Sequence, residues 1–152
     1  RREFHLTIVG DGPAMEACRE LARRHGMEEQ VTFRGRVANR EMHGELQQHG
    51  IFILMSSNEG LPISIIEAMR AGLPVITTNL AGMPEQVETG RNGVLIACKV
   101  EALADLLGRM GEYDWEAMGQ ESRRRFEREF TFSQMLQQYC AMLEGAAKSE
   151  SV

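Results

Sequence analysis

Two glutamates, Glu59 and Glu67, are separated by seven residues that read as a turn followed by the start of a helix. Pro62 lies between them and suits the first position of a helix, because its φ is already helical and its missing N–H would have no partner there. The next amides, on Ile63 and Ser64, are expected to point out of the helix end, with the positive end of the helix dipole behind them. Such an end binds phosphate or carboxylate groups.

Glu67 is predicted to lie about 7 Å along this helix, with its side chain leaning back toward the same end. A different face of the helix carries an apolar stripe of Ile65, Ala68, Met69 and Gly72. Glu67 therefore faces away from the buried stripe, and a carboxylate one turn beyond an anion site suits a ribose and its phosphates. The alternatives from the residues alone are a solvated surface glutamate at Glu67 and a plain turn residue at Glu59.

Further features follow the two glutamates in order: Ala68-Met69, Gly72-Leu73-Pro74-Val75 and Gly82-Met83-Pro84-Glu85. With Glu59, Gly60 and Glu67 they resemble the donor-binding segment of the group 1 (family 4) glycosyltransferases, retaining enzymes of the GT-B fold. The resemblance implies the C-terminal, donor-binding domain of such an enzyme. It implies transfer of a sugar from a nucleoside-diphosphate sugar to an acceptor hydroxyl, in glycan or cell-surface polysaccharide biosynthesis.

The resemblance also implies a role for each residue of this segment. Glu59 takes the catalytic position beside the transferred sugar, and Glu67 accepts hydrogen bonds from the two ribose hydroxyls. The backbone amides that contact sugar or phosphate come from Gly60, Leu61, Ile63 and Ser64, and the Ser64 hydroxyl adds a donor. An ionised carboxylate can accept from both hydroxyls of a diol, so glutamate is chemically suited to the ribose position.

Two loops nearer the N-terminus match the same family. Gly35-Arg36-Val37 resembles the loop that holds the nucleobase, largely through backbone groups at the valine position. Arg36 either contacts the base or a phosphate, or is a plain surface arginine. The run Gly10-Asp11-Gly12 resembles a Gly-x-Gly-Pro turn of the donor domain. It fails as a dinucleotide fingerprint, because Met15 stands where the third glycine would fall.

The composition is that of a soluble globular domain: 152 residues, of which 43% are hydrophobic and 26% charged. A formal net charge of −5 argues against a nucleic-acid partner. No apolar run approaches the ~20 residues of a membrane span, and the three separated cysteines fit a reducing cytoplasm. We therefore expect a cytoplasmic protein with no metal site and no cofactor, whose substrate is a nucleoside-diphosphate sugar.

Apolar runs and helical periodicity alternate along the chain. Strands are predicted at residues 4–9, 31–33, 51–55, 74–77 and 94–96, and helices at 14–25, 39–49, 62–71, 100–110, 115–130 and 133–144. This alternation predicts an α/β fold with a Rossmann-like parallel sheet, helices on both faces and a helical C-terminal tail. Ligands of such sheets bind at the carboxyl ends of the strands, where loops 10–13, 35–39 and 56–62 are expected to converge.

We assign residues 1–145 to one partial nucleotide-sugar-binding domain and residues 146–152 to a disordered tail. By the resemblance, the family's first strand and helix of this domain, with an Arg and a Lys for the diphosphate, lie outside these residues. By the same resemblance, the N-terminal acceptor domain also lies outside these residues. It is the expected partner of this domain, and any peripheral membrane contact is expected to be made through it. We therefore expect the fragment itself to be inactive, and its uncovered strand edge predicts self-association.

Two alternatives remain at this point. A GT-B relative such as a nucleotide-sugar epimerase would share the donor site but would invert or hydrolyse rather than transfer. A non-catalytic nucleotide-binding or scaffolding domain would keep the fold without needing Glu59. Hydrolase chemistry has no support, because Ser56-Ser57 lacks the Gly-x-Ser-x-Gly elbow and the histidines have no partner at catalytic spacing.

Overall fold

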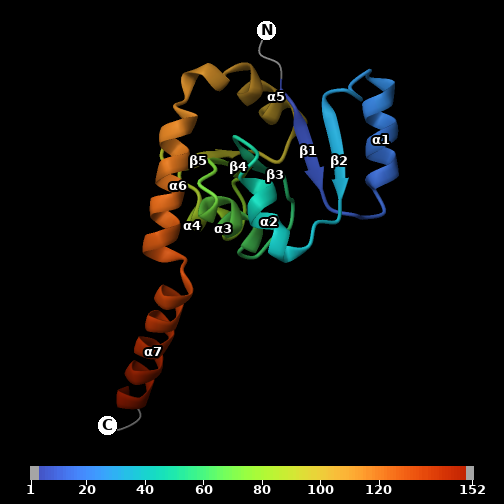
Figure 1. Cartoon of the computed structure of the whole chain (residues 1–152). Helices are drawn as coiled ribbons and strands as arrows, with labels where there is room; N and C mark the ends of the chain where they lie inside the picture. The colour runs from blue at the N-terminus through green and yellow to red at the C-terminus, as the bar shows by residue number, and fades with distance from the viewer. Residues whose placement is uncertain (1–3, 150–152) are drawn as a thin grey trace. The chain divides into compact units, whose positions relative to one another are not determined.

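The computed structural model of the chain describes residues 4–149 (Figure 1). They divide into two compact units between Met42 and His43, within helix α2 (Asn39–Leu46). Each unit has its own parallel sheet with helices beside it. The predicted α/β class is therefore confirmed.

The first unit consists of two parallel strands and the helix that connects them: β1 (Leu6–Val9), α1 (Met15–Arg24) and β2 (Val31–Gly35). The Arg19 guanidinium of α1 lies 4.6 Å from the centre of the Phe33 ring on β2, so the helix lies against the sheet. Gly26 follows the end of the helix in the left-handed region at φ 63°. No side chain of α1 is fully buried.

The second unit is built on a three-stranded parallel sheet in the order β3 (Phe52–Leu54), β4 (Val75–Thr78), β5 (Gly93–Ile96). Its helices are α3 (Ile63–Arg70), α4 (Met83–Gln86), α5 (Val100–Gly108), the 3-10 turn η1 (Met110–Glu112), α6 (Trp115–Glu129) and α7 (Phe132–Ser149). Every residue of β4 is buried, as a central strand covered on both faces requires.

The core of the second unit surrounds β4. Ile76 packs with one group of buried side chains, from β5, α5, η1 and α6: Val94, Leu106, Met110 and Met118. Helix α3 buries its predicted stripe of Ile65, Ala68 and Met69 completely. Each large apolar side chain buried in this way contributes about 1.5–3 kcal/mol, which holds α3 firmly on the sheet.

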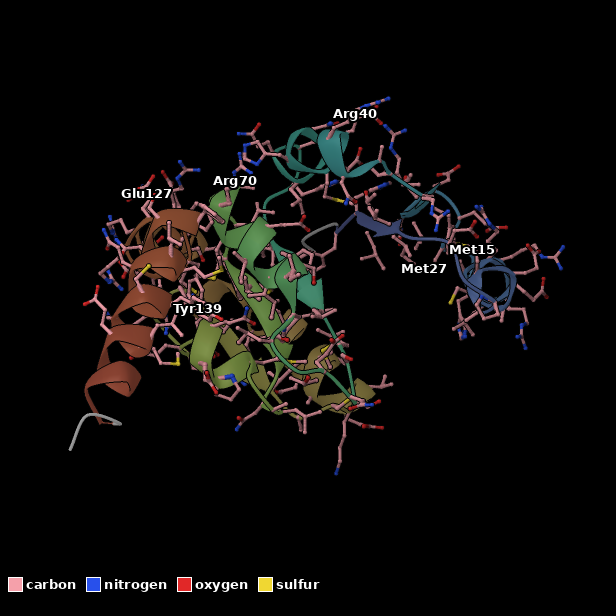
Figure 2. The ribbon with its side chains drawn as sticks, turned by 90° about the horizontal axis from the view of Figure 1, so that it is seen from below. Met15, Met27, Arg40, Arg70, Glu127 and Tyr139 are labelled. Atoms are coloured by element: carbon pink, nitrogen blue, oxygen red, sulfur yellow. The ribbon has the colours of Figure 1, made fainter. Side chains whose placement is uncertain are left out.

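Helix α3 is also held at its C-terminal end by α6. Gly72 closes α3 at φ 80°, and the Leu73 amide donates to the Ala68 carbonyl at 3.0 Å in a Schellman arrangement. Gly119 of α6 approaches this turn so closely that a Cβ there would lie 2.5 Å from the Gly72 oxygen. Figure 2 labels Arg70 on α3, whose carbonyl accepts from Arg123 of α6.

Three local predictions need correction. Pro62 precedes α3 as its N-cap rather than opening the helix. Helix α7 begins at Phe132 instead of at the predicted residue 133, and the Thr131 hydroxyl accepts from the Gln134 amide at 3.3 Å. The four-residue helix α4 was not predicted, since a single turn leaves no periodicity in the sequence.

The C-terminal helix is longer than predicted. The backbone of residues 146–149 is helical, where the sequence predicted a disordered tail, because the alanines of this stretch are strong helix formers. The prediction for residues 150–152 lies outside the described residues. Helix α7 presents an exposed apolar face of Phe132, Met135, Leu136, Tyr139, Met142 and Leu143 (Figure 2 labels Tyr139).

The described strands pair as two sheets rather than the single one predicted. Within each sheet every pairing is parallel, as predicted.

Self-association through an uncovered edge is the first prediction. In the part of the chain that the structure describes, β1 has one strand neighbour, and it exposes Leu6 by 44% and Val9 by 38%. We expect the protein to form dimers or larger species at high concentration in sedimentation velocity. Val9→Lys should shift it toward the monomer, because an edge lysine opposes strand pairing.

Val100→Lys is the matched control, because Val100 is 81% exposed but begins helix α5. It should leave the association unchanged. A monomeric wild-type protein at millimolar concentration, or equal effects of the two lysines, would contradict the prediction.

Candidate functional site

Glu59 and Glu67 lie on either side of the start of α3, as predicted. Glu59 is in the loop from β3 to α3, and Glu67 is on the helix, away from the buried stripe. Both are half-buried, and within residues 4–149 neither side chain has a hydrogen bond or ion pair. Two carboxylates held at the surface without partners remain available to a ligand with hydroxyl donors.

The first turn of α3 offers free amides between these carboxylates. Pro62 has φ −67° and ψ 121°, and its carbonyl accepts from the Ile65 amide at 3.3 Å. The amides of Ile63 and Ser64 have no backbone partner among the described residues. No acidic residue lies in the first turn, so nothing within the helix neutralises its positive end.

The remaining residues of the predicted site are accessible. Ile63 is 71% exposed and Leu61 47%, while Gly60 is exposed and Ser64 half-buried. The loop and the helix tip thus form an open surface of backbone donors with a glutamate on each side. This is the arrangement that the sequence predicted for residues 59–67.

The loop that carries Glu59 is anchored by the segment that follows it, from β4 to α4. Three of its carbonyls accept hydrogen bonds from this segment: Ser56 from the Thr78 hydroxyl at 2.7 Å, Gly60 from the Gly82 amide at 3.0 Å, and Pro62 from the Gln86 side chain at 3.1 Å. At the end of β3, just before the loop, the Leu54 carbonyl accepts from the Thr77 hydroxyl at 2.9 Å. Both threonines and Gln86 are buried. The anchors use the loop's carbonyls and leave its carboxylate free.

The turn between β4 and α4 is strained and close-packed where it meets the loop. Ala81 has φ 51°, a left-handed conformation that costs a non-glycine residue about 1–2 kcal/mol. At Gly82 a Cβ would lie 2.6 Å from the Gly60 oxygen, although φ −79° suits any residue. Glycine is therefore needed at 82 for space, not for conformation.

Sequence reasoning missed these anchoring residues. Gly82 belongs to the Gly-x-x-Glu turn that it noted, but Thr77, Thr78 and Gln86 were not recognised. The sequence does contain a signal for them, namely polar residues at positions where burial is expected. Two threonines end an otherwise apolar strand, and a glutamine ends the short helix after it. Buried polar side chains usually have hydrogen-bond partners, so such residues are candidates for anchoring a nearby loop.

The predicted nucleobase loop lies in the first unit. Gly35 ends β2 at φ 69° and its carbonyl accepts from the Gly10 amide at 2.9 Å, which brings the loops 10–13 and 35–39 side by side. Arg36 is exposed and Val37 half-buried. The convergence of these loops with residues 56–62 stays a prediction.

The described residues contain neither a candidate metal site nor a membrane-spanning helix. Among residues 4–149 no group of three or more His, Cys, Asp or Glu side chains is placed to hold a metal ion. Within the same range no helix is both long enough and apolar enough to cross a membrane.

Residues 1–112 match the family described as Glycosyl transferases group 1, and this range includes both glutamates, the helix tip and the anchoring turn. The chain belongs to this family. The resemblance stated from the motifs is thereby confirmed.

Two curated relatives show which glycosyltransferases the chain is similar to. It is 30% identical over 122 residues to the putative colanic acid biosynthesis glycosyltransferase WcaL of Salmonella typhimurium, covering 76% of this chain and 30% of that protein. It is 34% identical over 113 residues to a GDP-mannose-dependent alpha-(1-6)-phosphatidylinositol monomannoside mannosyltransferase of Mycobacterium tuberculosis, covering 69% and 29%. The chain thus spans about 30% of the length of these relatives.

Among solved structures, the complex of Anabaena Alr3699/HepE with UDP superposes with a TM-score of 0.81. The match covers 93% of this chain and 41% of that chain at 24% identity. At this identity the likeness shows the fold alone, and it is the fold of GT-B glycosyltransferases.

The close approach at Gly82 gives the second prediction. Gly82→Ala should destabilise the protein by about 1–3 kcal/mol, because the added methyl group forces the Gly60 carbonyl away. The amide at position 82 should also lose protection from hydrogen exchange. Both effects are measurable by urea denaturation and by exchange followed by NMR.

Gly108→Ala is the matched control, because no atom lies within 4 Å of a Cβ at this α5 glycine. It should be neutral or slightly stabilising. Equal unfolding free energies for the two variants would show that the loop and the turn are not in close contact.

Proposed function

We propose that this chain is the donor-binding part of a retaining glycosyltransferase that moves a sugar from a nucleoside diphosphate to an acceptor hydroxyl. One observation carries the proposal: two half-buried, unpartnered glutamates stand on either side of a helix end with free amides. Family membership supports it. The amides suit the diphosphate, and the carboxylates suit the hydroxyl groups on its two sides.

Glu67 is the proposed ribose residue. It is one helical turn beyond the free amides, so a nucleotide whose phosphates meet Ile63 and Ser64 has its ribose within reach of this side chain. Its carboxylate accepts from both ribose hydroxyls. Because these bonds exist in the bound substrate and in the transition state alike, they contribute mainly to binding.

Glu59 is the proposed catalytic residue beside the transferred sugar. The loop that carries it is fixed through its carbonyls, which leaves the carboxylate in place to stabilise positive character at the anomeric carbon. Gly60 and Leu61 offer the neighbouring backbone to sugar hydroxyls. The nucleobase is proposed to bind at Gly35, Arg36 and Val37.

The relatives' names support the wider assignment. One is named for colanic acid biosynthesis and one for GDP-mannose, and the matched solved structure holds UDP. We propose a role in cell-surface polysaccharide or glycan biosynthesis in the cytoplasm, with no cofactor and no nucleic-acid partner. The relatives are longer than this chain, and we propose that the acceptor domain and any membrane contact belong to the part that corresponds to this additional length. Residues 1–152 alone are proposed to be inactive.

The proposal is tested by titrating the intact protein with a panel of nucleoside diphosphates and their sugars in a calorimeter. Saturable binding of at least one nucleotide sugar, followed by transfer with retention at the anomeric carbon, is expected. Absence of nucleotide binding would overturn the proposal. Inversion or hydrolysis without an acceptor would favour the epimerase-like alternative, and binding without turnover the non-catalytic domain.

The third prediction separates the two glutamates. In the intact protein, Glu67→Gln should raise KM for the donor more than it lowers kcat, with a loss of about 1.5–3 kcal/mol of binding free energy at most. Glu59→Gln should instead lower kcat by roughly a hundred-fold with little change in KM. Steady-state kinetics and nucleoside-diphosphate affinity on both variants provide the measurement.

Glu28→Gln is the control, because Glu28 is an exposed turn residue between α1 and β2. It should change neither constant. Unchanged donor affinity in Glu67→Gln would refute the ribose role, and parallel losses of stability and activity in both variants would show that the two glutamates are structural.

A further inference from the structure

A chain of buried hydrogen bonds runs from α6 to the start of α3. The Ser122 hydroxyl donates to the Asn92 carbonyl at 3.0 Å, and the Asn92 amide group donates to the Gln86 carbonyl at 2.9 Å. The Gln86 amide group then donates to the Pro62 carbonyl at 3.1 Å. All three donor residues have no exposed surface, and Pro62 is buried as well.

Among these hydrogen-bonded residues, Gln86 is the one whose burial is not explained by core packing. Its Oε1 is buried and has no hydrogen-bond partner within the described residues. A buried amide with an unpaired oxygen is less favourable than an apolar side chain of the same shape. Within the described residues, the hydrogen bond that this side chain does make is with the Pro62 carbonyl at the start of α3.

That contact helps to fix the direction of a site amide. The Pro62 carbonyl and the Ile63 N–H belong to one planar, trans peptide unit, so they point in opposite directions. The Pro62 carbonyl accepts from the Gln86 side chain at 3.1 Å and from the Ile65 amide at 3.3 Å, so two donors hold it on the buried side and the Ile63 N–H is directed outward from the helix end. Pro62 has no N–H of its own, so its carbonyl is the only backbone hydrogen-bonding group by which this residue can be held.

We propose that Gln86 is a positioning residue of the donor site: through the Pro62 carbonyl it aims the free amides of α3 at the diphosphate of the bound nucleotide. The identity of the ligand as a diphosphate rests on the proposed function. The effect of Gln86 on the direction of the amides does not depend on the proposed function. Asn92 and Ser122 extend the support to α6, which fixes the far end of α3 as well.

The experiment compares Gln86→Met with Gln120→Met, an equal substitution at an exposed position of α6. Three quantities are measured on the 152-residue chain: the hydrogen exchange of the amides of residues 63–69, the affinity for UDP and GDP, and Tm. Gln86→Met should speed the exchange and weaken nucleotide affinity about ten-fold, with only a small fall in Tm, because the Pro62 carbonyl keeps the Ile65 amide as a partner. Gln120→Met should change none of these.

Leu106→Ala is the second control, because it removes a buried core side chain on α5. It should lower Tm with no change in nucleotide affinity, which separates positioning from general stability. Unchanged exchange at residues 63–69 in Gln86→Met would overturn the positioning role even if nucleotide binds well. If the wild-type chain binds no nucleotide but the exchange still speeds up, the positioning role is supported and the proposed ligand is wrong.

Discussion

The candidate site depends on how the loop between β3 and α3 is held. This loop has no strand or helix to satisfy its carbonyls, and buried carbonyls need partners. The segment from β4 to α4 supplies them, together with a partner for the Leu54 carbonyl at the end of β3, through two threonine hydroxyls, one backbone amide and one glutamine side chain. Since the donors come from a buried central strand and the segment after it, the loop takes its position from the core of the second unit.

Anchoring through carbonyls has a chemical consequence. The carboxylates of Glu59 and Glu67 are not used to hold the structure, so both remain without partners at the surface of the described chain. The first turn of α3 likewise contains no acid that would occupy its free amides. Negative and positive character therefore lie side by side without neutralising each other, which suits a ligand that has both hydroxyl donors and phosphate oxygens.

Helix α3 is held in three places, which explains why it can present a site. Its apolar stripe is buried on the sheet, its first residues are fixed through Pro62, and its last turn contacts α6 at Gly119. The Schellman turn at Gly72 allows this last contact because its left-handed conformation turns the chain back into β4. Packing, capping and polar anchoring thus act on the same eight-residue helix.

The sequence alone determined the strand and helix order, the buried stripe of α3, and both glutamates with the amides between them, because these depend on local periodicity and turn chemistry. The tertiary structure decided what local sequence does not contain. The loop's side-chain anchors lie 22 to 24 residues away along the chain, so no short-range pattern links them to it. Sheet pairing was likewise decided in three dimensions, because a strand's hydrogen bonds depend on which neighbour is present, and the described strands pair in two groups.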